Sequence, residues 1–233
     1  MIEKRLKTIN GKIFVKIPDH LNELTIGQMM ELQERPLLND LEAISILSGN
    51  SLDELKNATN MDAFSIFNDC VLSLTNQIKY LYDCDAIPNK ITFFTGKCSI
   101  KVSVIKNLSV EPVGAFMAAR EIIADEINEY ISQHGVGSLK ENFNPSLKAC
   151  CQVLAHYFFS KVTGKNYNEY EAEEFCNEIK KLRVTEALPI AKHFFTCYPN
   201  LLKPKINCFH RFRQFRKEKL AYSLLKNLNT STQ

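Results

Sequence analysis

The feature that most constrains the fold is the apolar pattern between Met61 and Tyr82. Its apolar side chains recur at steps of three and four residues, namely Phe64, Phe67, Val71, Leu74, Ile78 and Leu81. That period matches one face of an α-helix, whereas a strand would alternate every second residue. The pattern therefore predicts a long amphipathic helix whose apolar face packs in a core.

Capping patterns predict further helices along the chain. Thr25-Ile-Gly-Gln28 and Ser51-Leu-Asp-Glu54 have the form of a capping box, and Gly49 is a typical helix terminator after a helix over 39–47. Ser109 is expected to cap a helix with Glu111 and Pro112 in its first turn. Other expected helices, from their caps and terminators, cover 145–162, 168–182, 184–198 and 206–228.

Strand patterns are few. Residues 12–17 alternate and are rich in β-branched side chains, after a turn signal at Asn10-Gly11. Residues 91–95 and 98–104 flank Gly96-Lys97, which is typical of a hairpin. We therefore predict a mainly α fold with minor β (α+β): a multi-helix bundle with a short N-terminal strand and one β-hairpin near residues 91–104.

Composition places this chain among globular intracellular proteins. Of its 233 residues 45% are hydrophobic and 24% are charged, and no apolar run reaches the roughly 18–20 residues that span a bilayer. Met1 to Thr8 is charged, unlike a secretory signal. The eight cysteines are scattered without a C-x-x-C pair, so we expect reduced thiols packed as small hydrophobes.

Catalytic and metal-binding motifs are absent from the sequence. It contains no G-x-S-x-G, no P-loop, no G-x-G-x-x-G and no H-E-x-x-H. His156 and His193 lie among aromatic residues and are expected to be packed or hydrogen-bonded. Acidic residues cluster in 121–129 and 169–178, on helices with apolar opposite faces, which favours solvated surfaces. We therefore expect no enzyme activity, no cofactor and no metal.

The C-terminal part is strongly basic. Between Lys203 and Lys226 there are eight Lys or Arg and one acid, a net charge of +7, which leaves 21 basic and 25 acidic residues elsewhere, a net charge of −4. This divides the chain into a mainly helical body with small β elements, 1–202, and a basic C-terminal helix with a frayed end, 203–233. The candidate partner-binding residues interleave aromatics with cations and are Lys205, Phe209, Arg211, Phe212, Arg213, Arg216, Lys217 and Lys219.

Such a helix has several possible roles. It suits an acidic protein surface or nucleic-acid phosphates, and an anionic membrane is the least favoured partner. The alternative is a terminal helix that packs its phenylalanines on the body and leaves its charge in water.

Three stretches carry a resemblance to a known class of proteins. They are Val15 to Gln33 followed by Ala43 to Gly49, then Ile105 to Ile123, then Ala187 to Phe195. They resemble small structural and assembly proteins of tailed bacteriophages of Bacteroides-type hosts, including crAss-like phage virion proteins and tail assembly chaperones. The basic C-terminal part lies outside the resemblance.

The resemblance implies a morphogenesis role without an active site. The protein would be a virion component, at the head–tail junction or inside the particle, or a chaperone of tail proteins. Its partners would be other phage structural proteins and further copies of itself, in an oligomer or ring, and no membrane. It would be found in the host cytoplasm during assembly, and a structural part would be found in the virion. A nucleic-acid-binding protein that uses the basic C-terminal helix is the alternative.

Overall fold

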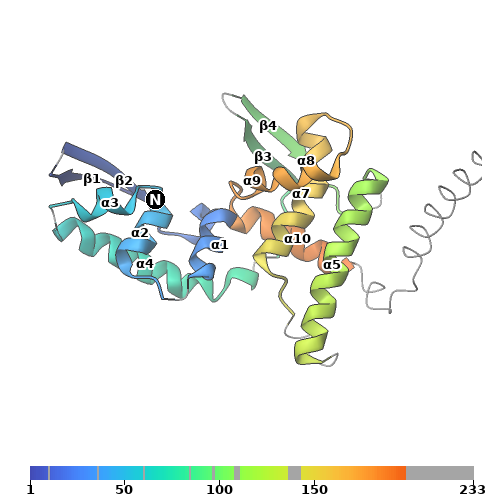
Figure 1. Cartoon of the computed structure of the whole chain (residues 1–233), viewed down its shortest axis with the longest axis horizontal. Coiled ribbons are helices and arrows are strands. Elements are labelled where there is room, and N and C mark those ends of the chain that lie inside the picture. The colour runs from blue at the N-terminus through green and yellow to red at the C-terminus, as the bar shows by residue number, and fades with distance from the viewer. Residues whose placement is uncertain are drawn as a thin grey trace, which may run out of the picture. The chain divides into compact units, whose positions relative to one another are not determined.

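The computed structural model describes residues 1–9, 11–35, 37–59, 61–83, 85–95, 98–107, 111–135 and 143–197 (Figure 1). Within these residues the fold is mainly helical, with two small antiparallel sheets of two strands each. The predicted fold class is confirmed. None of the helices described is both long and apolar enough to cross a bilayer.

The N-terminal sheet is a hairpin of β1 (Ile2–Thr8) and β2 (Gly11–Ile17), paired from Ile2 with Ile17 to Thr8 with Gly11. Gly11 has φ 143°, which favours glycine at this turn. The predicted N-terminal strand is thus one half of a hairpin. The sequence does not reveal β1 because Ile2 and Leu6 are its only large apolar residues, and pairing with β2 stabilises it.

Three capping boxes begin the first three α-helices. They start α1 (Ile26–Glu34), α2 (Asp40–Ser48) and α3 (Leu52–Lys56), with Thr25, Asn39 and Ser51 as the respective N-cap residues. The left-handed Gly49 ends α2, as predicted. A short 3-10 turn, η1 (Leu21–Glu23), precedes α1.

Helix α4 (Met61–Ile78) and a 3-10 turn, η2 (Leu81–Asp83), form the long apolar stripe. Phe67, Leu74 and Leu81 are almost fully buried, whereas Leu72 on the same helix is 63% exposed. The predicted core face is therefore confirmed. Helix α4 packs on α2 and on β1, and α2 also contacts β2.

The second sheet pairs β3 (Lys90–Thr95) with β4 (Cys98–Ser103), as predicted. Ile91, Phe93 and Val102 are buried on one face. The ring of Phe93 lies 5.2 Å from that of Phe158 and 5.8 Å from that of Phe175, so the hairpin is packed on the helical core.

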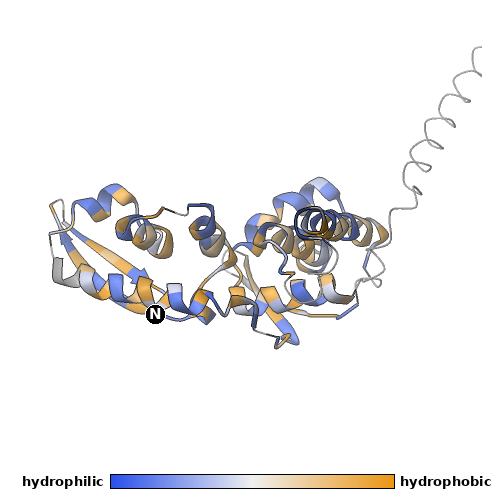
Figure 2. Ribbon diagram, turned by 90° about the horizontal axis from the view of Figure 1, so that it is seen from below, coloured by the Kyte–Doolittle hydropathy of each residue, from blue (hydrophilic) through white to orange (hydrophobic). Residues whose placement is uncertain are grey.

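The remaining helices surround α7 (Leu147–Thr163), which is buried almost continuously from Cys150 to Phe159. It contacts α5 (Val113–His134), α8 (Glu169–Glu174), α9 (Cys176–Ile179) and α10 (Val184–Cys197). In Figure 2 hydrophilic and hydrophobic residues alternate along the helical ribbons.

Three boundaries differ from prediction. Helix α4 ends at Ile78 instead of near Tyr82. Helix α5 begins at Val113 with Pro112 in the cap position, and Ser109 lies outside the described residues. The helix expected over 168–182 is two short helices that meet at Phe175, a buried residue. Packing of that ring on β3 and α7 outweighs the uninterrupted helical pattern of the segment.

The start of α1 is joined to the segment before α10 by backbone hydrogen bonds. The N–H groups of Ile26 and Gly27 donate to the carbonyls of Leu182 and Lys180, and the N–H of Val184 donates to Leu24, over 2.8–3.0 Å. These bonds satisfy donors that a helix N-terminus otherwise leaves free.

Candidate interaction groove

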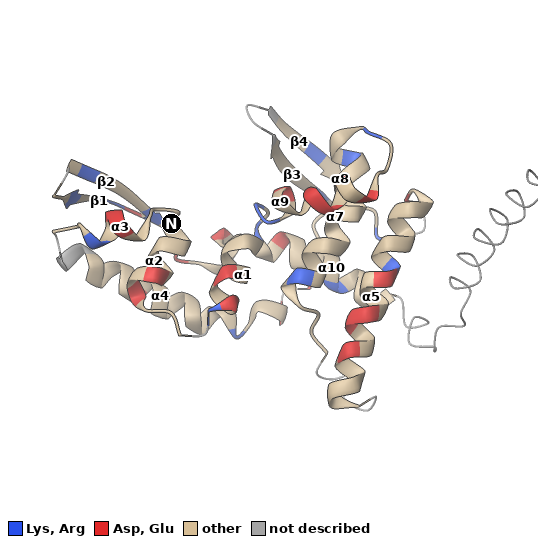
Figure 3. Ribbon diagram, viewed as in Figure 1, with Lys and Arg blue, Asp and Glu red and all other residues tan. Residues whose placement is uncertain are grey.

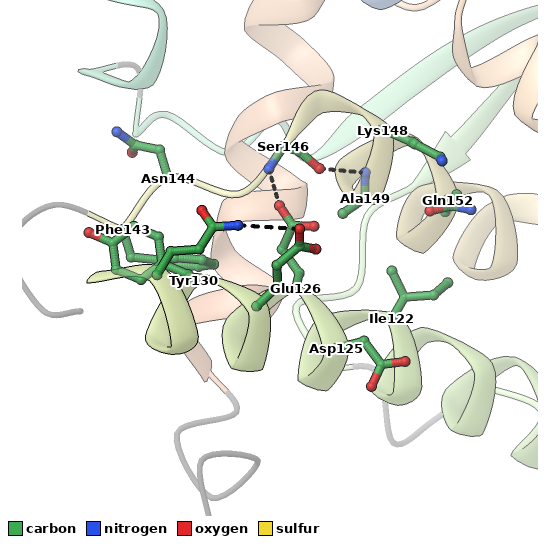
Figure 4. Close-up of a pocket in the computed structure, with 12 residues that line it drawn as sticks. Ile122, Asp125, Glu126, Tyr130, Phe143, Asn144, Ser146, Lys148, Ala149 and Gln152 are labelled. Carbon is green, nitrogen blue, oxygen red and sulfur yellow. Dashed lines mark hydrogen bonds between the residues drawn. The ribbon is translucent and has the colours of Figure 1, made fainter. Parts of the chain in front are cut away.

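The predicted partner-binding residues cannot be placed. Lys205, Phe209, Arg211, Phe212, Arg213, Arg216, Lys217 and Lys219 all lie outside the described residues. The described part of the chain does contain a surface groove that complements them in charge, and it is built by α5, α7 and the segment between Phe143 and Ser146 (Figure 4). The groove has a volume of about 570 Å³.

The segment that leads into α7 closes one side of the groove. The Ser146 N–H donates to Glu126 Oε1 over 2.6 Å, which joins the start of α7 to α5. The Ser146 hydroxyl accepts the Ala149 N–H over 3.2 Å and so caps α7. The same segment is also held by Tyr82, whose hydroxyl donates to the Pro145 carbonyl over 2.9 Å. Burial raises the pKa of Tyr82, which keeps this donor protonated.

One end of the groove is aromatic. The rings of Tyr130 and Phe143 meet edge to face with centroids 5.2 Å apart, and Phe143 lies 6.0 Å from Phe195. His134 stacks on Tyr130 with ring centroids 4.4 Å apart. Tyr130 and Phe143 are half-buried and line the groove, so they present ring surface to a partner.

The flank of the groove is acidic. Glu121, Asp125 and Glu129 lie four residues apart on α5, which places them on one side of the helix, and all three are exposed. Figure 3 shows these acidic positions in succession along α5. Of the residues lining the groove, Asp125, Glu126 and Glu129 are acidic and Lys148 is basic, a net charge of −2. The groove therefore suits a cationic segment that also carries apolar side chains.

No group of three or more His, Cys, Asp or Glu side chains in the described ranges is placed to hold a metal ion. On α8 the carboxylates of Glu169, Glu173 and Glu174 are exposed. Their exposure agrees with the expected solvated helix faces.

His156 is a packed histidine, as predicted. Its side chain is 4% exposed, and its Nδ1 lies 2.8 Å from the hydroxyl of Tyr167. Burial lowers the pKa of His156, while Glu169 and Glu173 oppose that shift. A neutral ring accepts the Tyr167 proton at Nδ1, and burial raises the pKa of Tyr167 to about 12.

A buried ion pair joins the start of α5 to α7. Lys161 Nζ lies 2.5 Å from Glu111 Oε1, with side chains 18% and 4% exposed. The same ammonium lies 3.6 Å from the centroid of the Tyr157 ring, a cation–π contact. The Tyr157 hydroxyl in turn donates to the Ile105 carbonyl over 2.8 Å. None of the side chains in this network lines the groove.

The thiols differ in burial. Cys150 and Cys151 are buried, and the pKa of each is raised, by burial for Cys150 and first by the contact with Cys176 for Cys151. The contact with Cys151 lowers the pKa of Cys176. The five cysteines whose side chains are described form no disulfide, and Cys84, Cys98 and Cys208 are not among them.

Comparison with known proteins gives no relative: no family model, no curated protein and no solved structure matches this chain. The groove was not predicted from sequence, because its two walls come from helices separated by residues 135–146. The signals that point to it are the four-residue spacing of acids on α5 and the cap at Ser146.

Proposed function

We propose that this chain is a non-enzymatic bacteriophage morphogenesis protein that acts through protein–protein contacts. In this role it is a structural virion component, at the head–tail junction or inside the particle, or a tail assembly chaperone. It needs no cofactor, and its partners are other phage structural proteins and copies of itself.

The observation that carries the proposal is that the three stretches resembling phage proteins pack together. Within residues 15–33, η1 and α1 contact α10, the helix that contains residues 187–195. Residues 105–123 meet the same helix where His193 Nε2 lies 3.1 Å from the Lys106 carbonyl. The resemblance thus covers one connected part of the fold, as expected for a shared structural unit.

The groove gives further support. It offers carboxylates and aromatic rings on an open surface, and those are features of a binding site for a basic segment. The division of charge within the chain also favours contact between proteins, since an acidic body and a basic segment attract one another in neighbouring copies.

The test is removal of the gene from the phage that encodes it, with the chain supplied in trans at graded levels. We expect electron micrographs of the lysate to show incomplete particles without the chain. The yield of complete particles should rise in proportion to the amount supplied, because an assembly component acts stoichiometrically. An enzyme would instead support full yield at trace levels.

Quantitative mass spectrometry of purified particles separates the two forms of the proposal. A fixed copy number per particle identifies a structural component, and absence from particles that nevertheless need the chain identifies a chaperone. Normal, infectious particles in the complete absence of the chain would overturn the proposal.

A further inference from the structure

We propose that the groove between α5 and α7 binds the basic segment 203–226 of a second copy of this chain. The proposal rests on the proposed assembly function and names the partner of the same groove. Each copy then carries one acidic groove and one basic segment, so contacts run head to tail and close into a ring when the rotation per copy permits.

Charge selects a cationic occupant. Helix α5 carries Glu121, Asp125, Glu126 and Glu129 against the single cation Arg120, a net charge of −3 along 113–134. These carboxylates repel nucleic-acid phosphates, so the groove itself excludes DNA and RNA. Segment 203–226 carries a net +7 and is the strongly basic stretch of this sequence, whose other 209 residues sum to −4.

The aromatic side chains of the segment also suit the groove. The segment interleaves Phe209, Phe212 and Phe215 with its arginines. The groove places the rings of Tyr130 and Phe143 at one end and the acidic flank beside them. Phenylalanine side chains of the segment can therefore contact aromatic rings while neighbouring guanidinium groups reach carboxylates, and guanidinium groups also stack on aromatic faces.

Glu126 keeps the groove in shape and is left out of the test. Its Oε1 already accepts the Ser146 N–H, so changing it would disturb the segment that closes the groove. The exposed stripe of Glu121, Asp125 and Glu129 is the part available for substitution.

The experiment uses charge reversal in the full-length chain. One variant carries Glu121→Lys, Asp125→Lys and Glu129→Lys, and the other carries Arg211→Glu, Arg213→Glu and Arg216→Glu. Light scattering across a concentration series measures self-association. Each variant should require at least about tenfold more protein than wild type for half-association. The lysine variant places like charges opposite one another, and the glutamate variant lowers the net charge of segment 203–226 from +7 to +1.

Mixing the two variants is the decisive step. The unreversed segment of the lysine variant and the unreversed groove of the glutamate variant still form the wild-type pair, so the mixture should associate to within about threefold of wild type. A matched control reverses three exposed acids outside the groove, Glu31→Lys, Glu34→Lys and Asp69→Lys, and should associate like wild type.

Several results would overturn the proposal. These are a wild type that stays monomeric, a reversed variant that associates like wild type, or a mixture that stays as weak as its components. If the lysine variant of the groove does not fold, Glu121→Gln, Asp125→Asn and Glu129→Gln replace it and must weaken association by at least about threefold. Failure here leaves the particle phenotype unchanged, and normal particles without the chain leave the measured association unchanged, so the two failures are distinguishable.

Discussion

At the scale of single residues, His156 gives the protein a pH dependence that can be predicted in sign. Burial lowers the pKa of His156 in the folded state below its unfolded value. The neutral ring therefore stabilises the fold fully above the unfolded pKa, near 6.5, and this stabilisation is lost as the pH falls from there toward the lowered pKa. The free energy of unfolding should decrease between roughly pH 7.5 and pH 5, by at most about 1.4 kcal/mol per pH unit from this residue.

The variant His156→Asn isolates that contribution. Asparagine retains an acceptor for the Tyr167 hydroxyl but does not titrate, so the difference in unfolding free energy between wild type and variant should shrink on acidification. Urea unfolding at each pH measures it, and other titrating groups cancel in the difference. A difference that stays constant over this range would contradict the assignment.

Sequence reasoning recovers the environment of His156 but not its partner. The run from Ala155 to Phe159 is apolar and aromatic, which indicates a buried helix face. Tyr167 lies beyond the end of α7, and only the turn at Gly164, with φ 68°, brings it back to the ring. Likewise nothing local in the sequence pairs Glu111 with Lys161, because fifty residues separate them.

At the scale of elements, α4 offers a direct comparison of its two faces. Phe67 is fully buried and its ring meets Phe64 edge to face, whereas Leu72 is 63% exposed. Phe67→Ala should lower the free energy of unfolding by about 3–5 kcal/mol through lost burial and a cavity. Leu72→Ala, the matched control on the same helix, should change it by less than about 0.5 kcal/mol. Equal effects in chemical denaturation would mean that the helix packs by another face.

The Glu111–Lys161 pair yields a second test, on the contact between α7 and the start of α5. Lys161→Met leaves the carboxylate of Glu111, 4% exposed, without its counter-charge and should cost about 3–5 kcal/mol. Adding Glu111→Gln should recover most of that loss, because the remaining amide is neutral. A double-mutant cycle by urea unfolding measures the coupling. Additive effects of the two substitutions would show that the charges do not interact.

Capping and periodicity patterns in the sequence predicted an element correctly where the tertiary packing favours the same local structure. Thr25 and Ser51 begin helices because their capping boxes satisfy backbone donors within four residues. Strand β1 escaped prediction because its stability comes from pairing with β2, and the break at Phe175 comes from its ring packing on β3 and α7. The groove was not predicted for the same reason, because it forms only when α5 and α7 pack together.

At the scale of the whole molecule, charge is the property that links body and C-terminal segment. The predictions for Lys205 to Lys219 stay predictions, because those residues are outside the described structure. In the proposed contact between copies, the net −4 on the remaining residues adds a long-range attraction to the +7 on 203–226, and that attraction depends on salt.

Salt dependence therefore distinguishes a protein partner from DNA. Replacing Arg211, Arg213, Arg216 and Lys217 with glutamine should weaken self-association while leaving the unfolding of the body unchanged. For wild type, a contact anchored by phenylalanines should weaken only modestly between roughly 50 and 200 mM salt. A DNA contact through 6–10 phosphates would lose about 10³–10⁵ in affinity over that range.

A control with Lys4, Lys12, Lys56 and Lys79 changed to glutamine removes the same charge from the body and should associate like wild type. If the C-terminal variant associates normally and binds DNA no less tightly than wild type, the basic segment is a solvated surface and neither partner is its ligand.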